Sequence, residues 1–163
     1  MTQNSYTDGS HTYLFTYGTL MSDGPLNSHI KKRGGEYHAD AVTARGWDMD
    51  SLSAYPIAAR PKSYDTEMRI LGEVWRIPWV VLPLLDQVEG SEYVRSCQMV
   101  YLLDQNDNIT DETIPAQVFT AKFWQQPSNG PLPPGIYFHK SLEALSWNNQ
   151  QSWNSATTRK ENN

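Results

Sequence analysis

The apolar positions of the chain fall into short runs rich in β-branched and aromatic residues, a pattern typical of β-strands. Residues 12–17 predict a buried strand that ends at Gly18. Looser alternation over residues 37–47 predicts a second strand, and residues 69–77 predict a stronger third one. Residues 53–59 form either a short strand or a loop. The first half of the chain is therefore expected to be mainly β-structure.

The second half of the chain holds the clearest local pairing. Residues 93–103 and 114–122 predict two strands, and the turn-rich segment 104–108 predicts that they form a β-hairpin. Residues 124–135 contain four of the ten prolines and predict a loop.

Helical patterns are few and short. Residues 26–32 predict a short helix, residues 81–89 a second and residues 141–147 a third. Pro83 lacks an amide hydrogen, so the second helix should start late or be kinked. Several strands with a few short helices, without regular β-α-β alternation, predict the α+β class rather than a doubly wound α/β fold.

The length of 163 residues corresponds to one domain with tails. Residues 1–11 and 148–163 are polar, and we expect them to be frayed or disordered. Residues 12–147 then form a single domain, because neither a repeat nor an internal linker divides them.

Composition and charge argue against several classes of partner. The net charge is −5, whereas a nucleic-acid-binding domain should carry a basic excess. The sequence holds no run of about 20 apolar residues and no apolar leader, so we expect a cytoplasmic protein that binds neither nucleic acid nor membrane. The single cysteine, Cys97, excludes an intramolecular disulfide, and its place in a predicted strand favours an inert, buried thiol.

The motifs of several common cofactor and metal sites are absent. The sequence contains neither G-x-G-x-x-G, a P-loop nor G-x-S-x-G, and its four histidines lack metal-binding spacing. Residues 104–108 imitate the start of a calcium loop, but Ile109 and Pro115 stand where Gly and Glu are required. We therefore expect no metal and no cofactor.

Two segments carry candidate chemistry. The strand 12–17 runs into Gly18, and past its end the amides of residues 18–21 lose their sheet partners and become free to bind a carboxylate or carbonyl. The alternative is an ordinary turn glycine.

In the second segment, a helix would place Val81, Leu85 and Glu89 on one apolar stripe. A carboxyl on that stripe, at the negative end of a helix, should have a raised pKa suited to a general base and acid. The alternative is a glutamate at a frayed last turn, bent out to water.

Taken together, these segments resemble the γ-glutamylcyclotransferase-like family, which includes γ-glutamylamine cyclotransferases and an enzyme of butirosin biosynthesis. The resemblance covers roughly residues 12–122, and its two main motifs are specific only in combination. The matching pieces, in the family's order, are Y-G-T-L at 17–20, Y-P at 55–56, G-E-V-W at 72–75, L-D-x-x-E-G-x-x-Y-x-R at 85–95, and a final strand at 116–119.

The resemblance implies a compact mixed β-barrel with helices packed around it and a pocket at its mouth. By this resemblance Glu89 is the catalytic residue and Tyr93 is an aromatic residue near the pocket. Glu73 recurs in the family, where a structural role is favoured over one in the pocket. The residues implied to hold the γ-glutamyl group are Tyr17, Gly18, Thr19 and Leu20.

The implied reaction is cyclisation of a small-molecule γ-glutamyl amine or peptide to 5-oxoproline, with release of the amine and without a metal or cofactor. Two departures from the family pattern affect substrate choice: residues 79–81 are bulky, and the loop 124–135 is long and forms either a lid or a partner surface.

Two other functions stay open. One is a non-catalytic module that binds a small molecule in the same pocket, and the other is an interaction protein that uses the loop 124–135. The sequence does not indicate the oligomeric state.

Overall fold

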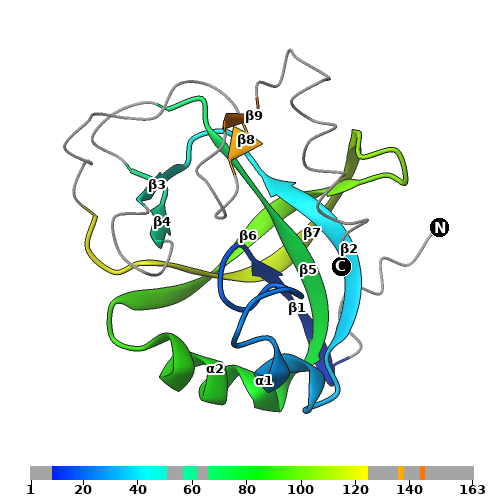
Figure 1. The fold of residues 1–163 in the computed structure, drawn as a ribbon, viewed down its shortest axis with the longest axis vertical. Helices are drawn as coiled ribbons and strands as arrows, with labels where there is room; N and C mark the ends of the chain where they lie inside the picture. Colours follow the sequence, from blue (N-terminus) through cyan, green and yellow to red (C-terminus); the bar gives the residue numbers. More distant parts are fainter. Residues whose placement is uncertain (1–8, 51–56, 62–65, 125–135, 138–143, 146–163) are drawn as a thin grey trace.

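A closed barrel of long strands forms the body of the molecule (Figure 1). The structure is a computed structural model and describes residues 9–50, 57–61, 66–124, 136–137 and 144–145. Within this part, five strands follow the order β1-β7-β6-β2-β5, and pairing of β1 with β5 closes the barrel. These strands are β1 (His11–Thr16), β2 (Glu36–Thr43), β5 (Arg69–Pro78), β6 (Tyr93–Leu103) and β7 (Ile109–Ala121).

Strand β1 closes the barrel by pairing with a strand on each side. It pairs antiparallel with β5, with Phe15 opposite Val74, and parallel with β7, with Phe15 opposite Val118. Strands β6 and β7 form a long antiparallel hairpin, and β2 pairs antiparallel with both β5 and β6. Because β1 is hydrogen-bonded on both sides, the residues that follow it leave the barrel from a fixed point.

Short elements extend this barrel. Strands β8 (Ile136–Tyr137) and β9 (Ala144–Leu145) continue the sheet beyond β5, while β3 (Asp48–Asp50) and β4 (Ile57–Ala59) form a separate pair. Helices α1 (Ser28–Lys31) and α2 (Leu82–Glu89) lie at one end of the barrel (Figure 1).

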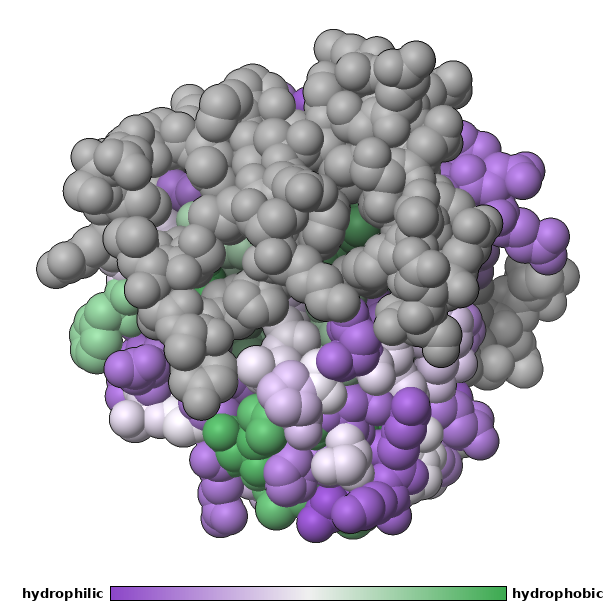
Figure 2. Space-filling view, viewed as in Figure 1, coloured by the Kyte–Doolittle hydropathy of each residue, from purple (hydrophilic) through white to green (hydrophobic). Residues whose placement is uncertain are grey.

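Two apolar clusters hold these parts together. One fills the barrel and includes the fully buried Trp47, Ile70 and Ile114. The other seats the helices on the barrel and includes Leu85 of α2 and Ile30 of α1, both without exposed surface. Over α2, the surface shows an apolar patch among mainly hydrophilic residues (Figure 2). The helices are thus held by their apolar stripes, as is usual for short helices.

The structure confirms the predicted α+β class and the compact mixed barrel. The predicted strand 93–103 coincides with β6, and the predicted hairpin forms with β7, which begins earlier, at Ile109. The helix at 81–89 starts at Leu82 after a 3₁₀ turn, since Pro83 is tolerated only in a first helical turn.

Three predictions of secondary structure or burial are wrong in the described residues. Ala144–Leu145 is a strand rather than part of a helix, because β8 offers it backbone partners that a local pattern does not reveal. The strand predicted over 37–47 ends at Thr43, and Trp47 instead bridges to Met68. Cys97 is exposed rather than buried, because its side of β6 faces out of the barrel while Val100 faces in. Most of the predicted loop 124–135 and of the two polar tails lies outside the described residues.

Candidate active site

The chain bends sharply after β1, and hydrogen bonds to its carbonyl groups define the bend. The carbonyl oxygen of Gly18 accepts a hydrogen bond from the Met21 amide at 3.0 Å, and that of Thr19 accepts one from the Leu26 amide at 3.0 Å. The carbonyl oxygen of Leu20 accepts a hydrogen bond from the side-chain amide of Asn27 at 2.8 Å. Each carbonyl of the bend is therefore occupied from within the protein.

The amide groups of the same bend are different. Within the described part of the chain, the N–H groups of Gly18, Thr19 and Leu20 have no hydrogen-bond acceptor. They are successive backbone donors of the kind that binds a carboxylate or an oxyanion. Met21 differs from the sequence expectation, because its amide is used within the turn. We call residues 18–20 the amide loop.

Glu89 is the last residue of α2 and faces the barrel rather than water. Leu85, one turn earlier, is fully buried, whereas Asp86 and Gln87 on the other side of the helix are exposed. Gly90 ends the helix with a φ of 85° and donates its amide hydrogen to the carbonyl of Asp86. Burial raises the pKa of Glu89 from 4.5 to about 7. The structure thus supports the interpretation of Glu89 as a partly buried, poorly hydrated carboxyl at a well-formed helix end.

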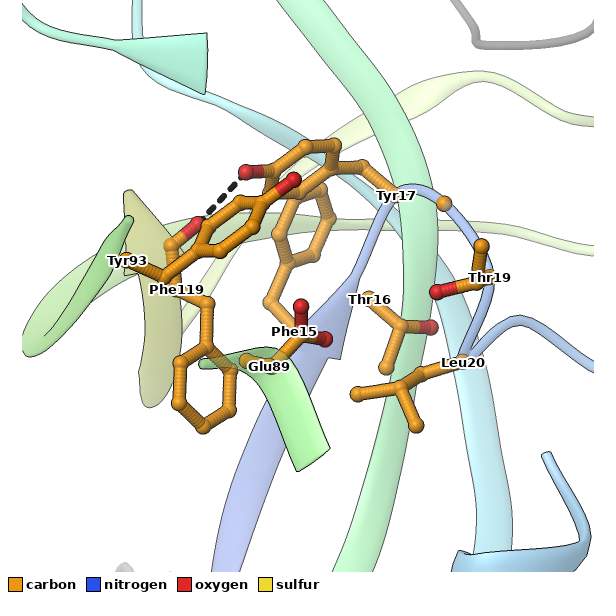
Figure 3. A pocket seen from close by; sticks show the side chains of 9 residues that line it. Phe15, Thr16, Tyr17, Thr19, Leu20, Glu89, Tyr93 and Phe119 are labelled. Carbon is orange, nitrogen blue, oxygen red and sulfur yellow. Dashed lines mark hydrogen bonds between the residues drawn. The ribbon is translucent and has the colours of Figure 1, made fainter. Parts of the chain in front are cut away.

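The amide loop and Glu89 line one pocket (Figure 3). Its empty volume is about 320 Å³, including the part that is open to solvent. In Figure 3 the carboxyl of Glu89 points into the pocket beneath the rings of Tyr17 and Tyr93, and the hydroxyl of Thr19 lies on the opposite side. The residues that line the pocket are Phe15, Thr16, Tyr17, Gly18, Thr19, Leu20, Glu89, Tyr93 and Phe119.

All six residues singled out from the sequence therefore meet at this pocket. Sequence reasoning missed three further lining residues, which are Phe15, Thr16 and Phe119. Phe15 and Thr16 belong to the buried strand before Gly18, a neighbourhood that could have suggested them. Phe119 arrives through the parallel pairing of β1 with β7, and no local signal indicates that pairing.

Tyr17 forms a fixed wall of the pocket. Its side chain is 6% exposed, and its hydroxyl donates a hydrogen bond to the carbonyl oxygen of Phe119 at 2.5 Å. Burial, with smaller contributions from Tyr93 and Glu89, raises the pKa of Tyr17 well above its usual value. The hydroxyl therefore stays protonated, and Tyr17 bridges the end of β1 to β7.

Glu73 lies outside this pocket, in a network that ties the bend to β5. Its carboxylate accepts hydrogen bonds from the amide and the hydroxyl of Ser22, at 2.7 and 2.6 Å, and from the indole N–H of Trp75 at 3.0 Å. Its side chain is 3% exposed. These contacts support the structural role expected for Glu73. The Tyr-Pro pair at 55–56 lies outside the described residues.

Over the ranges that the structure describes, no three His, Cys, Asp or Glu side chains gather as they would around a metal ion. Helices long and apolar enough to cross a membrane are likewise absent from these ranges.

The model of the family described as gamma-glutamyl cyclotransferase, AIG2-like, matches residues 14–139 of the chain. A search of curated proteins finds no match.

Solved structures share the fold at low sequence identity. An AIG2-like protein from Mus musculus is 18% identical, with a TM-score of 0.59, over 71% of this chain and 80% of its own. A protein from Arabidopsis thaliana is 19% identical, with a TM-score of 0.58, over 96% of this chain and 89% of its own. A protein specific to uropathogenic E. coli is 21% identical, with a TM-score of 0.54, over 71% of this chain and 82% of its own. At such identities the likeness concerns the fold alone.

Proposed function

The chain belongs to the gamma-glutamyl cyclotransferase, AIG2-like family, and from that premise we propose that it cyclises a γ-glutamyl amine or peptide to 5-oxoproline and releases the amine. The observation that carries the proposal is the pocket itself. A partly buried carboxyl with a pKa of about 7 lines the same small space as a loop of backbone amides that have no acceptor among the described residues.

The reaction needs a proton to move from the nucleophile to the leaving group. In a γ-glutamyl amide, the α-amino group can reach its own γ-carbonyl carbon and close a five-membered ring. Ionised Glu89 takes a proton from the α-ammonium group, the freed nitrogen attacks, and a carbon–nitrogen bond forms. Protonated Glu89 then gives that proton to the leaving nitrogen as the original amide bond breaks. The carboxylate, ionised again, takes the surplus proton from the ring nitrogen, which leaves neutral 5-oxoproline, and passes that proton to the released amine or to solvent. A pKa near neutrality suits both transfers.

The amide loop supplies the complementary electrostatics. As the ring closes, the γ-carbonyl oxygen acquires negative charge, and preorganised N–H donors stabilise such an oxyanion more than they stabilise the neutral carbonyl. The rings of Tyr17 and Tyr93 restrict the space above Glu89 and favour a curled substrate (Figure 3). Holding the chain curled makes the attack intramolecular and lowers its entropic cost.

The test is a panel of γ-glutamyl amines and peptides, with 5-oxoproline release measured by mass spectrometry. The wild type should release 5-oxoproline from at least one compound, and Glu89→Gln should lower that rate by about 10²–10⁴-fold, because the amide cannot exchange protons. Glu92→Gln is the matched control, since Glu92 is exposed in the turn just before β6 and lies outside the pocket lining.

Unchanged turnover in Glu89→Gln would refute the proposed mechanism. The competing function, a non-catalytic binding module, predicts that a γ-glutamyl compound raises the melting temperature of both proteins and is recovered chemically intact.

A further inference from the structure

The amide loop keeps its shape through two buried polar side chains that do not touch the pocket. We propose that Asn27 and Glu73 are positioning residues, which hold the carbonyls of the bend outward so that the N–H groups of Thr19 and Leu20 face the substrate. This inference rests on the proposed function, and it adds two residues that act on the rate through the loop.

Asn27 provides the first anchor. It stands at the N-terminal end of α1, a position where asparagine commonly caps the helix, but its side chain makes no capping hydrogen bond. The side chain is 3% exposed, and its nitrogen donates to the carbonyl of Leu20 at 2.8 Å. Its oxygen has no partner within the described part of the chain. Burying a side-chain amide that makes a single hydrogen bond costs stability. Asn27 therefore binds the amide loop instead of capping helix α1.

Glu73 provides the second anchor, just beyond the loop. Both of its carboxylate oxygens receive hydrogen bonds from Ser22, one from the backbone amide and one from the hydroxyl. Because Glu73 belongs to β5, which is paired to β1 along its length, these bonds attach both ends of the bend to the same strand pair. A charged acceptor makes such hydrogen bonds shorter and stronger than neutral ones.

Gly24 shows how little room the bend has to relax. A Cβ atom at this position would lie 2.1 Å from the carbonyl oxygen of Thr19, a distance shorter than any permitted contact. The carbonyl of Thr19 is thus enclosed between Gly24 and the amide of Leu26 that donates to it. Met21, Leu26 and Asn27 hold the carbonyls of Gly18, Thr19 and Leu20. Because a trans peptide group is planar, with its N–H opposite its carbonyl, the first two contacts fix the N–H groups of Thr19 and Leu20 on the other side of the chain. The Asn27 contact fixes the Met21 amide, which in turn holds the Gly18 carbonyl.

Such a loop needs no rearrangement when charge develops on a bound oxygen. Fixed donors are most effective in the transition state, where the charge is greatest. Loosening either anchor should therefore slow the chemical step more than it weakens substrate binding. A purely structural role would affect the melting temperature without this selective loss of kcat.

The experiment compares Asn27→Ala and Ser22→Ala with Ser28→Ala, using the substrate found in the panel. Ser28 is exposed in the same segment, its side chain makes no hydrogen bond within the described residues, and its replacement should leave kcat unchanged. We expect kcat to fall about tenfold or more in Asn27→Ala and less in Ser22→Ala, with KM changing by less than about threefold. Asn27→Ser, which keeps a shorter donor, replaces Asn27→Ala if that variant does not fold.

Amide hydrogen exchange gives a readout that does not need activity. The amides of Met21 and Leu26 should lose protection in both anchor variants, while the β6–β7 hairpin keeps its protection. Wild-type kcat in both variants, or a fall in kcat accompanied by loss of protection throughout the barrel, would overturn the positioning role. A wild type that releases no 5-oxoproline from any compound would instead refute the proposed function itself.

Discussion

Ionising Glu89 costs the folded protein free energy, because burial leaves its carboxylate with less water than it has in the unfolded chain. The raised pKa means that the folded state holds the proton more tightly than the unfolded chain does. The stabilisation from the protonated carboxyl is complete below about pH 4.5 and is lost as the pH rises through about 7. The residue proposed for catalysis is thus also a residue that weakens the fold at neutral pH.

Replacing Glu89 by glutamine should therefore stabilise the protein at high pH while it lowers turnover. At pH 8, Glu89→Gln should unfold with a free energy about 1–3 kcal/mol above that of the wild type, and at pH 4 the two should agree. Denaturant titrations at the two pH values measure this difference. Equal stability of the two proteins at pH 8 would mean that Glu89 is well hydrated.

At the residue scale, the sequence predicted the burial of a helical side chain better than that of a side chain in a strand. Glu89 could be recognised because helical spacing places it on the stripe of Val81 and Leu85. Cys97 could not be placed correctly, because a strand pattern alone does not say which of its two faces is covered. The amide of Met21 was misassigned for a related reason, since its partner depends on how tightly the bend closes.

The position of Glu89 depends on how α2 is attached to the barrel. Asp86, one turn before Glu89, accepts hydrogen bonds from Arg95 of β6 at 2.8 and 3.2 Å, and Arg95 also donates to Gln117 of β7 at 2.9 Å. This bidentate contact ties the end of the helix to the hairpin that carries Tyr93 and Phe119. It therefore fixes two walls of the pocket relative to each other.

Breaking this contact should affect activity more than stability. Asp86→Asn combined with Arg95→Gln should lower kcat/KM several-fold but reduce the unfolding free energy by no more than about 1 kcal/mol, as is usual for exposed ion pairs. The control is the exposed pair of Arg45 and Glu67, at 3.1 Å and away from α2, whose removal should leave kcat/KM unchanged. Equal kinetic effects from both pairs would contradict the attachment role.

Gly72 permits the close contact of β5 with β1. A Cβ atom there would lie 2.2 Å from the carbonyl oxygen of Thr16 and 2.6 Å from the ring of Phe15, both of which line the pocket. Gly72→Ala should therefore lower the unfolding free energy by about 1–3 kcal/mol, as overpacking typically does, and reduce 5-oxoproline release. Thermal unfolding measures the first effect, and an unchanged melting temperature would show that the two strands have room to separate.

At the scale of the whole molecule, local parts of the fold were predictable and its closure was not. The β6–β7 hairpin could be predicted because its turn and both strands are adjacent in sequence. The parallel pairing of β1 with β7 joins segments about a hundred residues apart and leaves no periodic signal. The barrel was expected from the family resemblance, and the contribution of Phe119 to the pocket could not be expected at all.

The pocket exists only because this closure gathers distant segments. Strand β1 supplies the amide loop at its end, α2 supplies Glu89, and the β6–β7 hairpin supplies Tyr93 and Phe119. The proposed catalytic base and the proposed oxyanion donors thus come from different elements that the closed barrel brings together, so that activity should be lost whenever the barrel opens.

The most direct test of the account is the pH dependence of kcat/KM for 5-oxoproline release. Because the reaction needs ionised Glu89, kcat/KM should rise about tenfold per pH unit at low pH and level off above a midpoint near 7. A midpoint near 4.5, or a profile without an ionisation in this range, would contradict the claim that a water-poor glutamate drives the reaction.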